Sequence, residues 1–308
     1  LKDPRVKYFL NDPDESLRYA AIRAINDLDL LTALPDLAAH IQPYAAAAAP
    51  GPRPPADHRD AIIQTRLINA NFRVGKNENA ANLLAYAAQT KLPAMLREQA
   101  LLAIDEWRRP NPVDSTTGHY RPLPPESRED ITAAVKAGLP GVFQTAEGPL
   151  VGLATRIALT YGVDAPEKLL LTQIRDAASE VSSRVSSLEG LVRQNPAALA
   201  GHWDELLADE SVIFRSAVVR QLLALDPPRG LAAASAMARS ESLGARQQGY
   251  RLLAGSTAPE AIALFRERLA AVDEELPGAL LDLLESAAAM KDESIAGLLA
   301  AYEKGIDP

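Results

Sequence analysis

Residues 211–225, SVIFRSAVVRQLLAL, carry a helical pattern that recurs every 31 residues. Arg215 lies 31 residues after Arg184 and 31 before Arg246. Large apolar residues keep the same register four and seven positions further on: Leu188, Val219, Tyr250 and Leu281, then Leu191, Leu222, Leu253 and Leu284. A fixed period of this size, built from helices, is typical of solenoids, whose units bury their apolar faces only against their neighbours. The pattern predicts an all-α fold of stacked helix pairs, an α-solenoid.

The same register places the remaining helices. A short helix is expected over residues 2–10, and the next opens with Asp14 as its N-cap. An outer helix is expected over 77–89, and the inner helix after it starts at Leu92-Pro93. Further inner helices are expected at about 149–161, 180–194, 211–225, 242–254 and 276–289, alternating with outer helices at about 166–177, 197–208, 229–239, 259–271 and 292–304. The first position of the register falls at 18, 66, 97, 153, 184, 215, 246 and 277, which predicts about eight helix pairs in one array over 1–308.

Two proline-rich segments interrupt the period, at about 42–58 and 108–128. The first contains QPYAAAAAPGPRPPAD and the second lies within RRPNPVDSTTGHYRPLPPESRED. Clustered Pro and Gly do not allow a continuous helix, so both segments are expected to be loop insertions.

Composition narrows the classes of function. The formal net charge is −8, whereas nucleic-acid binding needs a basic face. Only 5% of residues are aromatic, few for a deep small-molecule pocket. The chain has no cysteine, which excludes disulfides, thiolate metal sites and thioether haem attachment within it. No apolar run is long enough to span a membrane.

Searches for catalytic motifs identify no reactive residue. The four histidines are scattered without metal-ligand spacing: His40, His58, His119 and His202. No glycine-rich phosphate loop precedes a helix, and no GxSxG motif occurs. We therefore expect a chain that is not an enzyme and that holds no metal or cofactor.

The first departure from the repeat is NANFRVG, residues 69–75, where Asn69 and Arg73 replace small and apolar residues. One interpretation is a helix end that turns out to solvent, with Phe72 taking the core position and Gly75 following the last turn. The other is that Asn69, Asn71 and Arg73 hydrogen-bond to a neighbouring loop or a partner surface.

The second departure is residues 107–123, which combine the aromatic and arginine residues enriched in interface hot spots. Its candidate partner-binding residues are Trp107, Arg109, Tyr120 and Arg121. A structural loop fixed to the array is the alternative. If the loop is an interface, alanine at Trp107 and Arg121 should abolish binding without affecting folding; loss of folding would mark the loop as structural.

Arginine occupies six of the eight first positions: Arg18, Arg66, Arg97, Arg184, Arg215 and Arg246. We expect these side chains to pair with carboxylates or loop carbonyls between adjacent repeats. Only Asp14 and Glu180 lie four residues before their arginine, so the acidic partners are expected on neighbouring repeats.

The segments DPRVKYFLNDPDESLRYAAIRAINDL, RLINANFRVG and EWRRPNPVDSTTGHYRPLP resemble the HEAT-repeat region of dehydrogenase-like proteins of Planctomycetes and Verrucomicrobia. Those proteins combine a β-propeller, HEAT repeats and a c-type haem domain. The resemblance covers residues 3–125 best. It implies a HEAT-like connecting scaffold outside the cytoplasm; it does not extend sugar oxidation or electron transfer to this chain, which has no CxxCH motif.

The favoured hypothesis is a non-catalytic scaffold that binds other domains of a longer parent chain or a protein partner, without nucleic-acid binding or membrane insertion. The chain begins at Leu1 rather than Met, and we expect it to be part of a longer protein. A HEAT-like lyase of the bilin lyase type, acting on a bound small molecule, is the alternative. A HEAT-type DNA glycosylase is a third option, which the acidic composition disfavours.

Overall fold

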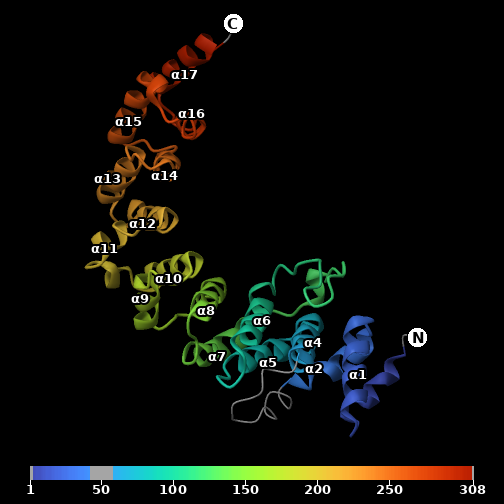
Figure 1. The fold of residues 1–308 in the computed structure, drawn as a ribbon. Helices are drawn as coiled ribbons and strands as arrows, with labels where there is room; N and C mark the ends of the chain where they lie inside the picture. The colour runs from blue at the N-terminus through green and yellow to red at the C-terminus, as the bar shows by residue number, and fades with distance from the viewer. Residues whose placement is uncertain (1–2, 42–57, 307–308) are drawn as a thin grey trace. The chain divides into compact units, whose positions relative to one another are not determined.

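The computed structural model describes residues 3–41 and 58–306 (Figure 1). The described part of the chain is built of α-helices and short 3-10 helices, and its β-structure is limited to one isolated bridge between Val113 and Tyr120. This is the expected all-α helical-repeat fold. The first expected insertion, about 42–58, lies outside the described residues except for His58, which begins a helix.

The chain divides into two compact units, residues 1–190 and 191–308. The helices up to the division are α1 (Glu15–Asp27), α2 (Leu34–Ala38), α4 (His58–Val74), α5 (Asn77–Ala87), α6 (Ala94–Asp105), α7 (Thr132–Phe143), α8 (Pro149–Tyr161) and α9 (Glu167–Arg175). The division falls within α10 (Val181–Gln194). The second unit continues with α11 (Trp203–Leu207), α12 (Val212–Leu225), α13 (Pro227–Ala238), α14 (Leu243–Leu253), α15 (Pro259–Ala270), α16 (Leu280–Ala288) and α17 (Glu293–Ile306).

Each unit has an inner and an outer layer of helices. In the first unit, α1, α4, α6 and α8 pack one on the next, while α5 packs on α7. In the second unit, α12, α14 and α16 form one row, and α13, α15 and α17 form the other. Apart from α7, the inner and outer rows are the ones that the 31-residue period predicts, because each helix buries its apolar stripe against the next repeat.

Several elements differ from the expected ones. The expected helix over 2–10 is the 3-10 helix η1 (Pro4–Asn11), and the expected outer helix over 197–208 is split into η4 (Pro196–Leu199) and α11. The inner helix expected at 276 begins at Leu280, because Pro277 and Gly278 precede it. Helix α7 was not predicted. The N-cap at Asp14 is confirmed, since its carboxylate accepts a hydrogen bond from the amide of Ser16.

The arginines at the first positions of the register, here called the arginine column, connect outer helices to inner ones. Nε of Arg97 donates to the carbonyl of Ala87, the last residue of α5, and Nε of Arg184 donates to Ile174 near the end of α9. Carbonyls at a helix C-terminus lack partners within the helix and carry partial negative charge. The guanidinium groups of Arg18 and Arg215 bind carbonyls of the loop just before their own helix. Arg18 and Arg215 thus pair with loop carbonyls, but these carbonyls precede their own helix and do not lie between adjacent repeats as expected.

Two arginines of the column also have acidic partners on neighbouring repeats, as expected. Arg66 on α4 forms two hydrogen bonds to Asp27 on α1, of 2.9 and 2.8 Å. Arg246 on α14 lies 2.6 Å from Glu275, and both side chains are almost fully buried. The arginine column therefore links neighbouring repeats as well as the helices within a repeat.

Candidate functional site

The long connection between α6 and α7 begins at Trp107, whose side chain is buried. The guanidinium of Arg128 lies over two rings, 4.1 Å from the Trp107 centroid and 4.3 Å from that of Phe72. Arg128 also donates from Nε to the Trp107 carbonyl and from Nη1 to the Phe72 carbonyl, both at 2.8 Å. One side chain thus holds the beginning and the end of the connection together and fixes both to α4.

Burial of this cation has an electrostatic cost. Desolvation lowers the pKa of Arg128 to about 10. The faces of the two aromatic rings and the two carbonyl oxygens offset part of that cost, because each presents negative charge to the guanidinium. Nε1 of Trp107 in turn donates to the carbonyl of Glu129 at 3.1 Å, so the indole is also fixed by a hydrogen bond.

Between these ends, the chain forms a short hairpin around Asp114. The amide of Asp114 donates to the carbonyl of His119, and the amide of Arg121 donates to Pro112. Oδ1 of Asp114 accepts from the amides of Thr116 and Thr117, at 2.9 and 3.0 Å. A carboxylate that binds the amides two and three residues on is typical of a tight turn. The sequence DSTTG at 114–118 therefore forms a turn, completed by Gly118 in the left-handed region with φ of 70°.

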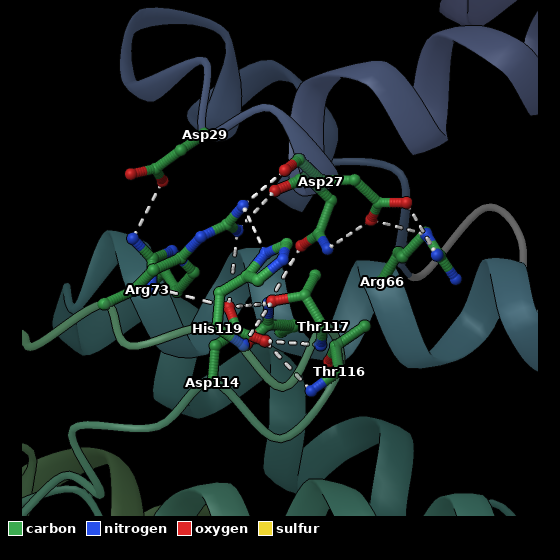
Figure 2. A network of polar contacts seen from close by, with 11 residues as sticks. Asp27, Asp29, Arg66, Arg73, Asp114, Thr116, Thr117 and His119 are labelled. Atoms are coloured by element: carbon green, nitrogen blue, oxygen red, sulfur yellow. Dashed lines mark hydrogen bonds and ion pairs between the residues drawn. The ribbon is translucent and has the colours of Figure 1, made fainter.

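The other oxygen of Asp114 joins this turn to the helices (Figure 2). Oδ2 lies 3.5 Å from Nη1 of Arg73 on α4 and 3.7 Å from Nη1 of Arg121. It also accepts a 3.1 Å hydrogen bond from Nδ2 of Asn69. The Asp114 side chain is only 1% exposed. A carboxylate buried this deeply needs paired charges and hydrogen bonds, and here it has both.

The network continues to α1. Arg121 donates to the backbone carbonyls of Asn26 and Asp27, and Nδ2 of Asn69 reaches Oδ1 of Asn26 at 2.9 Å. Burial alone would raise the pKa of Asp27, but hydrogen bonds from Arg66 and from Asn26 outweigh it and hold the pKa below its usual range. In Figure 2, the side chains of Asp27, Arg66, Arg73 and Asp114 converge from α1, α4 and the loop.

Arg73 makes a second ion pair, 2.8 Å from Nη2 to Oδ1 of Asp29. Asp29 has a positive φ of 57°, unusual for a residue other than glycine. The ion pair helps to hold this turn after α1, because it forms only when the Asp29 carboxylate faces α4. Two carboxylates from separate segments therefore share one nearly buried guanidinium.

Asn71 has a different role from Asn69 and Arg73. Its side chain is fully buried and donates to the carbonyls of Ala38 and Leu67, and its oxygen accepts from Asn79 on α5. It therefore links α2, α4 and α5 within the core, away from the loop. The interpretation of residues 69–73 as a helix end that turns out to solvent is therefore wrong. The turn at Gly75 that belongs to the same interpretation is present, with φ of 75°.

The outward side of the hairpin is solvent-exposed and apolar in part. Tyr120 is 75% exposed and Val113 is 44% exposed, and these two residues form the β-bridge. Arg109 is exposed as well, and its guanidinium has no ion pair with the described residues. Of the candidate partner-binding residues, Arg109 and Tyr120 therefore remain accessible, while the other five are engaged inside the molecule: Asn69, Asn71, Arg73, Trp107 and Arg121.

Asp114 and Arg128, which organise the loop, are not among the residues that the sequence predicted. A signal for Asp114 exists, because Asp followed by Ser, Thr and Gly favours a side-chain-capped turn. Arg128 follows three prolines and a serine with no periodic pattern, and nothing local distinguishes it from a surface arginine. Its role depends on two rings that come from other segments.

The polar groups of Asn69, Arg73 and Asp114 are engaged with one another. Across residues 3–41 and 58–306, no group of three or more His, Asp or Glu side chains is placed to hold a metal ion. The Asp114 carboxylate is saturated by cations and amides, which makes it unsuitable as a general base. No helix among the described residues is long and apolar enough to cross a membrane.

Comparison with known proteins adds no relative. No protein-family model matches the chain, and no curated protein shows significant sequence similarity to it. The resemblance to the HEAT-repeat region of dehydrogenase-like proteins therefore stays a prediction, and so does the location outside the cytoplasm that it implies.

Proposed function

We propose that this chain is a non-catalytic helical-repeat scaffold that binds another domain of its parent protein, or a separate protein, through the hairpin at residues 112–121. The observation that carries the proposal is the contrast between the two sides of this hairpin. Its inner side is fixed by the buried Asp114 network, while its outer side presents Tyr120 and Val113 to solvent.

An exposed aromatic residue on an ordered hairpin is suited to protein recognition. Tyrosine supplies a large contact area with a hydrogen-bonding hydroxyl, and it is enriched among hot spots. A loop that is ordered before binding loses less conformational entropy on association than a flexible one. The hairpin backbone is held by two hydrogen bonds between its two arms and by the capped turn, so its geometry exists in the free chain.

The partner can be identified by photo-crosslinking. A benzophenone amino acid at position 120 is expected to crosslink a specific protein, and excess unlabelled wild-type chain should compete for it. The same probe at position 8 is a matched control, because Tyr8 is 74% exposed in the same unit.

Binding of the purified partner then tests the proposal. Tyr120→Ala is expected to weaken the affinity at least about tenfold, as for an interface hot spot, with an unchanged thermal melt. Tyr8→Ala should leave the affinity at the wild-type value. Equal affinities of wild type and Tyr120→Ala would reject the hairpin as the docking element.

A further inference from the structure

A cavity of about 260 Å³ lies between α4, α6 and the turn of the hairpin. Its apolar lining comes from the two helices: Ile68, Phe72, Leu102 and Ala103. Its polar lining comes from all three segments: Thr65, Asn69, Gln99, Glu106, Ser115 and Thr116. The volume is enough for one long side chain and is small for a drug-sized ligand, which typically needs about 300–1,000 Å³.

The lining contains a single charged residue, Glu106 at the end of α6, and no lysine or arginine. Its carboxylate has no hydrogen bond or ion pair with any residue in the described ranges. The neighbouring carboxylates differ in this respect. Asp105 pairs with Arg156 at 2.9 Å, and Asp114 is held by Arg73 and Arg121. Glu106 is thus a half-buried negative charge left without an internal cation.

A second acceptor lines the same cavity. The amide nitrogen of Asn69 donates to both Asn26 and Asp114, which fixes the orientation of the amide. Its oxygen accepts no hydrogen bond from the described residues, and the residue lines the cavity although it is only 6% exposed. Oε1 of Gln99 is already used by the hydroxyl of Thr65. The cavity lining therefore combines a carboxylate and an amide oxygen, neither of them used by the described residues, with apolar side chains.

This combination selects a class of ligand. An anion would be repelled by Glu106, and a purely apolar group would bury Glu106 and Asn69 without a partner. The side chains of lysine and arginine have an apolar stem and a cationic head, and both parts find their complement here. We infer that the cavity is an anchor pocket for a lysine or arginine side chain of the protein partner. Naming a protein as the source of that side chain rests on the proposed function.

The pocket can be tested with capped amino acids. N-acetyl-arginine N-methylamide, the lysine equivalent and the neutral isostere N-acetyl-citrulline N-methylamide are titrated into the ¹⁵N-labelled chain. Chemical-shift changes at the side-chain amides of Gln99 and Asn69 report binding. At least one of the two cations is expected to bind about tenfold more tightly than citrulline, because only a cation neutralises Glu106. Equal binding of all three probes would overturn the inference.

Variants locate the site. Glu106→Gln is expected to reduce cation binding to the citrulline level, and Ala103→Leu should block all three probes by filling the cavity. Glu78→Gln is the matched control, an exposed glutamate on α5 outside the cavity, and should bind as wild type. Full cation affinity in Glu106→Gln would also overturn the inference.

The partner assay separates this inference from the proposed function. Loss of partner binding in Tyr120→Ala together with wild-type affinity in Glu106→Gln would overturn the pocket and keep the hairpin. Loss of partner binding in both variants supports both the hairpin and the pocket. A third outcome is that the pocket binds the cations while Tyr120→Ala and Glu106→Gln both bind the partner with wild-type affinity. That result would overturn a protein side chain as the occupant and leave a free organic cation as the ligand.

Discussion

Arg73 on α4 and Asp114 in the loop after α6 approach to 3.5 Å, with side chains only 5% and 1% exposed. This pair joins a helix of the repeat array to a hairpin that interrupts the array. Asp114 also binds Arg121, whose guanidinium donates to the carbonyls of Asn26 and Asp27 on α1, so the loop is held to α1 and α4 at once. The hairpin is therefore part of the folded first unit.

Replacing Asp114 should release the hairpin. Asp114→Ala leaves two largely buried guanidinium groups without their shared carboxylate and removes the cap of the turn. Breaking a buried ion pair costs about 3–5 kcal/mol of unfolding free energy. Urea denaturation followed by the fluorescence of Trp107, in a Trp203→Phe background, measures the first unit. Glu78→Ala is the control and should change the free energy of unfolding by less than about 0.5 kcal/mol.

The contribution of each arginine of the column to the free energy of unfolding should increase with the burial of its side chain. Arg97 is 6% exposed and donates to Ala87 and to Thr145, so Arg97→Ala leaves buried carbonyls without a donor. A loss of about 2–4 kcal/mol in unfolding free energy is expected. Arg18 binds carbonyls at a more exposed position, and Arg18→Ala should cost about 1 kcal/mol or less. Equal losses for the two variants in the same denaturation assay would contradict this ranking.

Close helix packing in the second unit should depend on Gly249. A Cβ atom there would collide with the backbone of Ala238 at the end of α13, whereas one at Gly244 on the same helix would meet nothing within 4 Å. Gly249→Ala is expected to destabilise the second unit by about 1–3 kcal/mol, and Gly244→Ala to stabilise it by up to about 1 kcal/mol. Trp203 fluorescence in a Trp107→Phe background gives both values. A neutral Gly249→Ala would show that α13 and α14 can separate without loss.

The second unit should lose stability in acid through Glu275. Burial alone would raise the pKa of Glu275, but hydrogen bonds from Tyr250 and from Arg246 hold the pKa below its usual range. The folded state therefore favours the ionised form. Its contribution is complete above the unfolded pKa of about 4.3 and is lost as the pH falls through the lower folded value.

Glu275→Gln separates that contribution from the rest of the acid response. The variant is expected to be less stable than wild type at pH 7, and the difference should shrink as the pH falls below about 4. Denaturation of the second unit at several pH values, again followed by Trp203, supplies the measurement. A difference that grew in acid would mean that Glu275 is not held ionised by its neighbours.

The sequence predicted the repeat well because the period is local information. Arg184, Arg215 and Arg246 recur at 31 residues, and the helices expected around them lie within a few residues of α10, α12 and α14. Helix α7 escaped prediction because Gly138, Pro140 and Gly141 all disfavour helix. Tertiary packing overrides them: a Cβ atom at Gly138 would lie 2.9 Å from Cβ of Leu84, so glycine allows α7 to approach α5 closely.

The site was predicted in part. Residues 69–75 and 107–123 were identified because they break the repeat, and the structure joins them through Asn69, Arg73 and Asp114. The direction of each side chain could not be predicted, because the neighbouring residues Tyr120 and Arg121 face opposite ways. Tyr120 is exposed to solvent, whereas Arg121 is largely buried. Alanine at Trp107 or Arg121 is now expected to impair folding of the loop, so Tyr120 is the residue that tests binding.

Amide hydrogen exchange across residues 112–121 tests the rigid hairpin most directly. The amides of Asp114 and Arg121 donate to His119 and Pro112. We expect both to exchange at least about 100-fold more slowly than in an unstructured peptide, and to lose that protection in Asp114→Ala. Exchange of both amides at the unstructured rate in the wild-type chain would contradict a hairpin formed before binding.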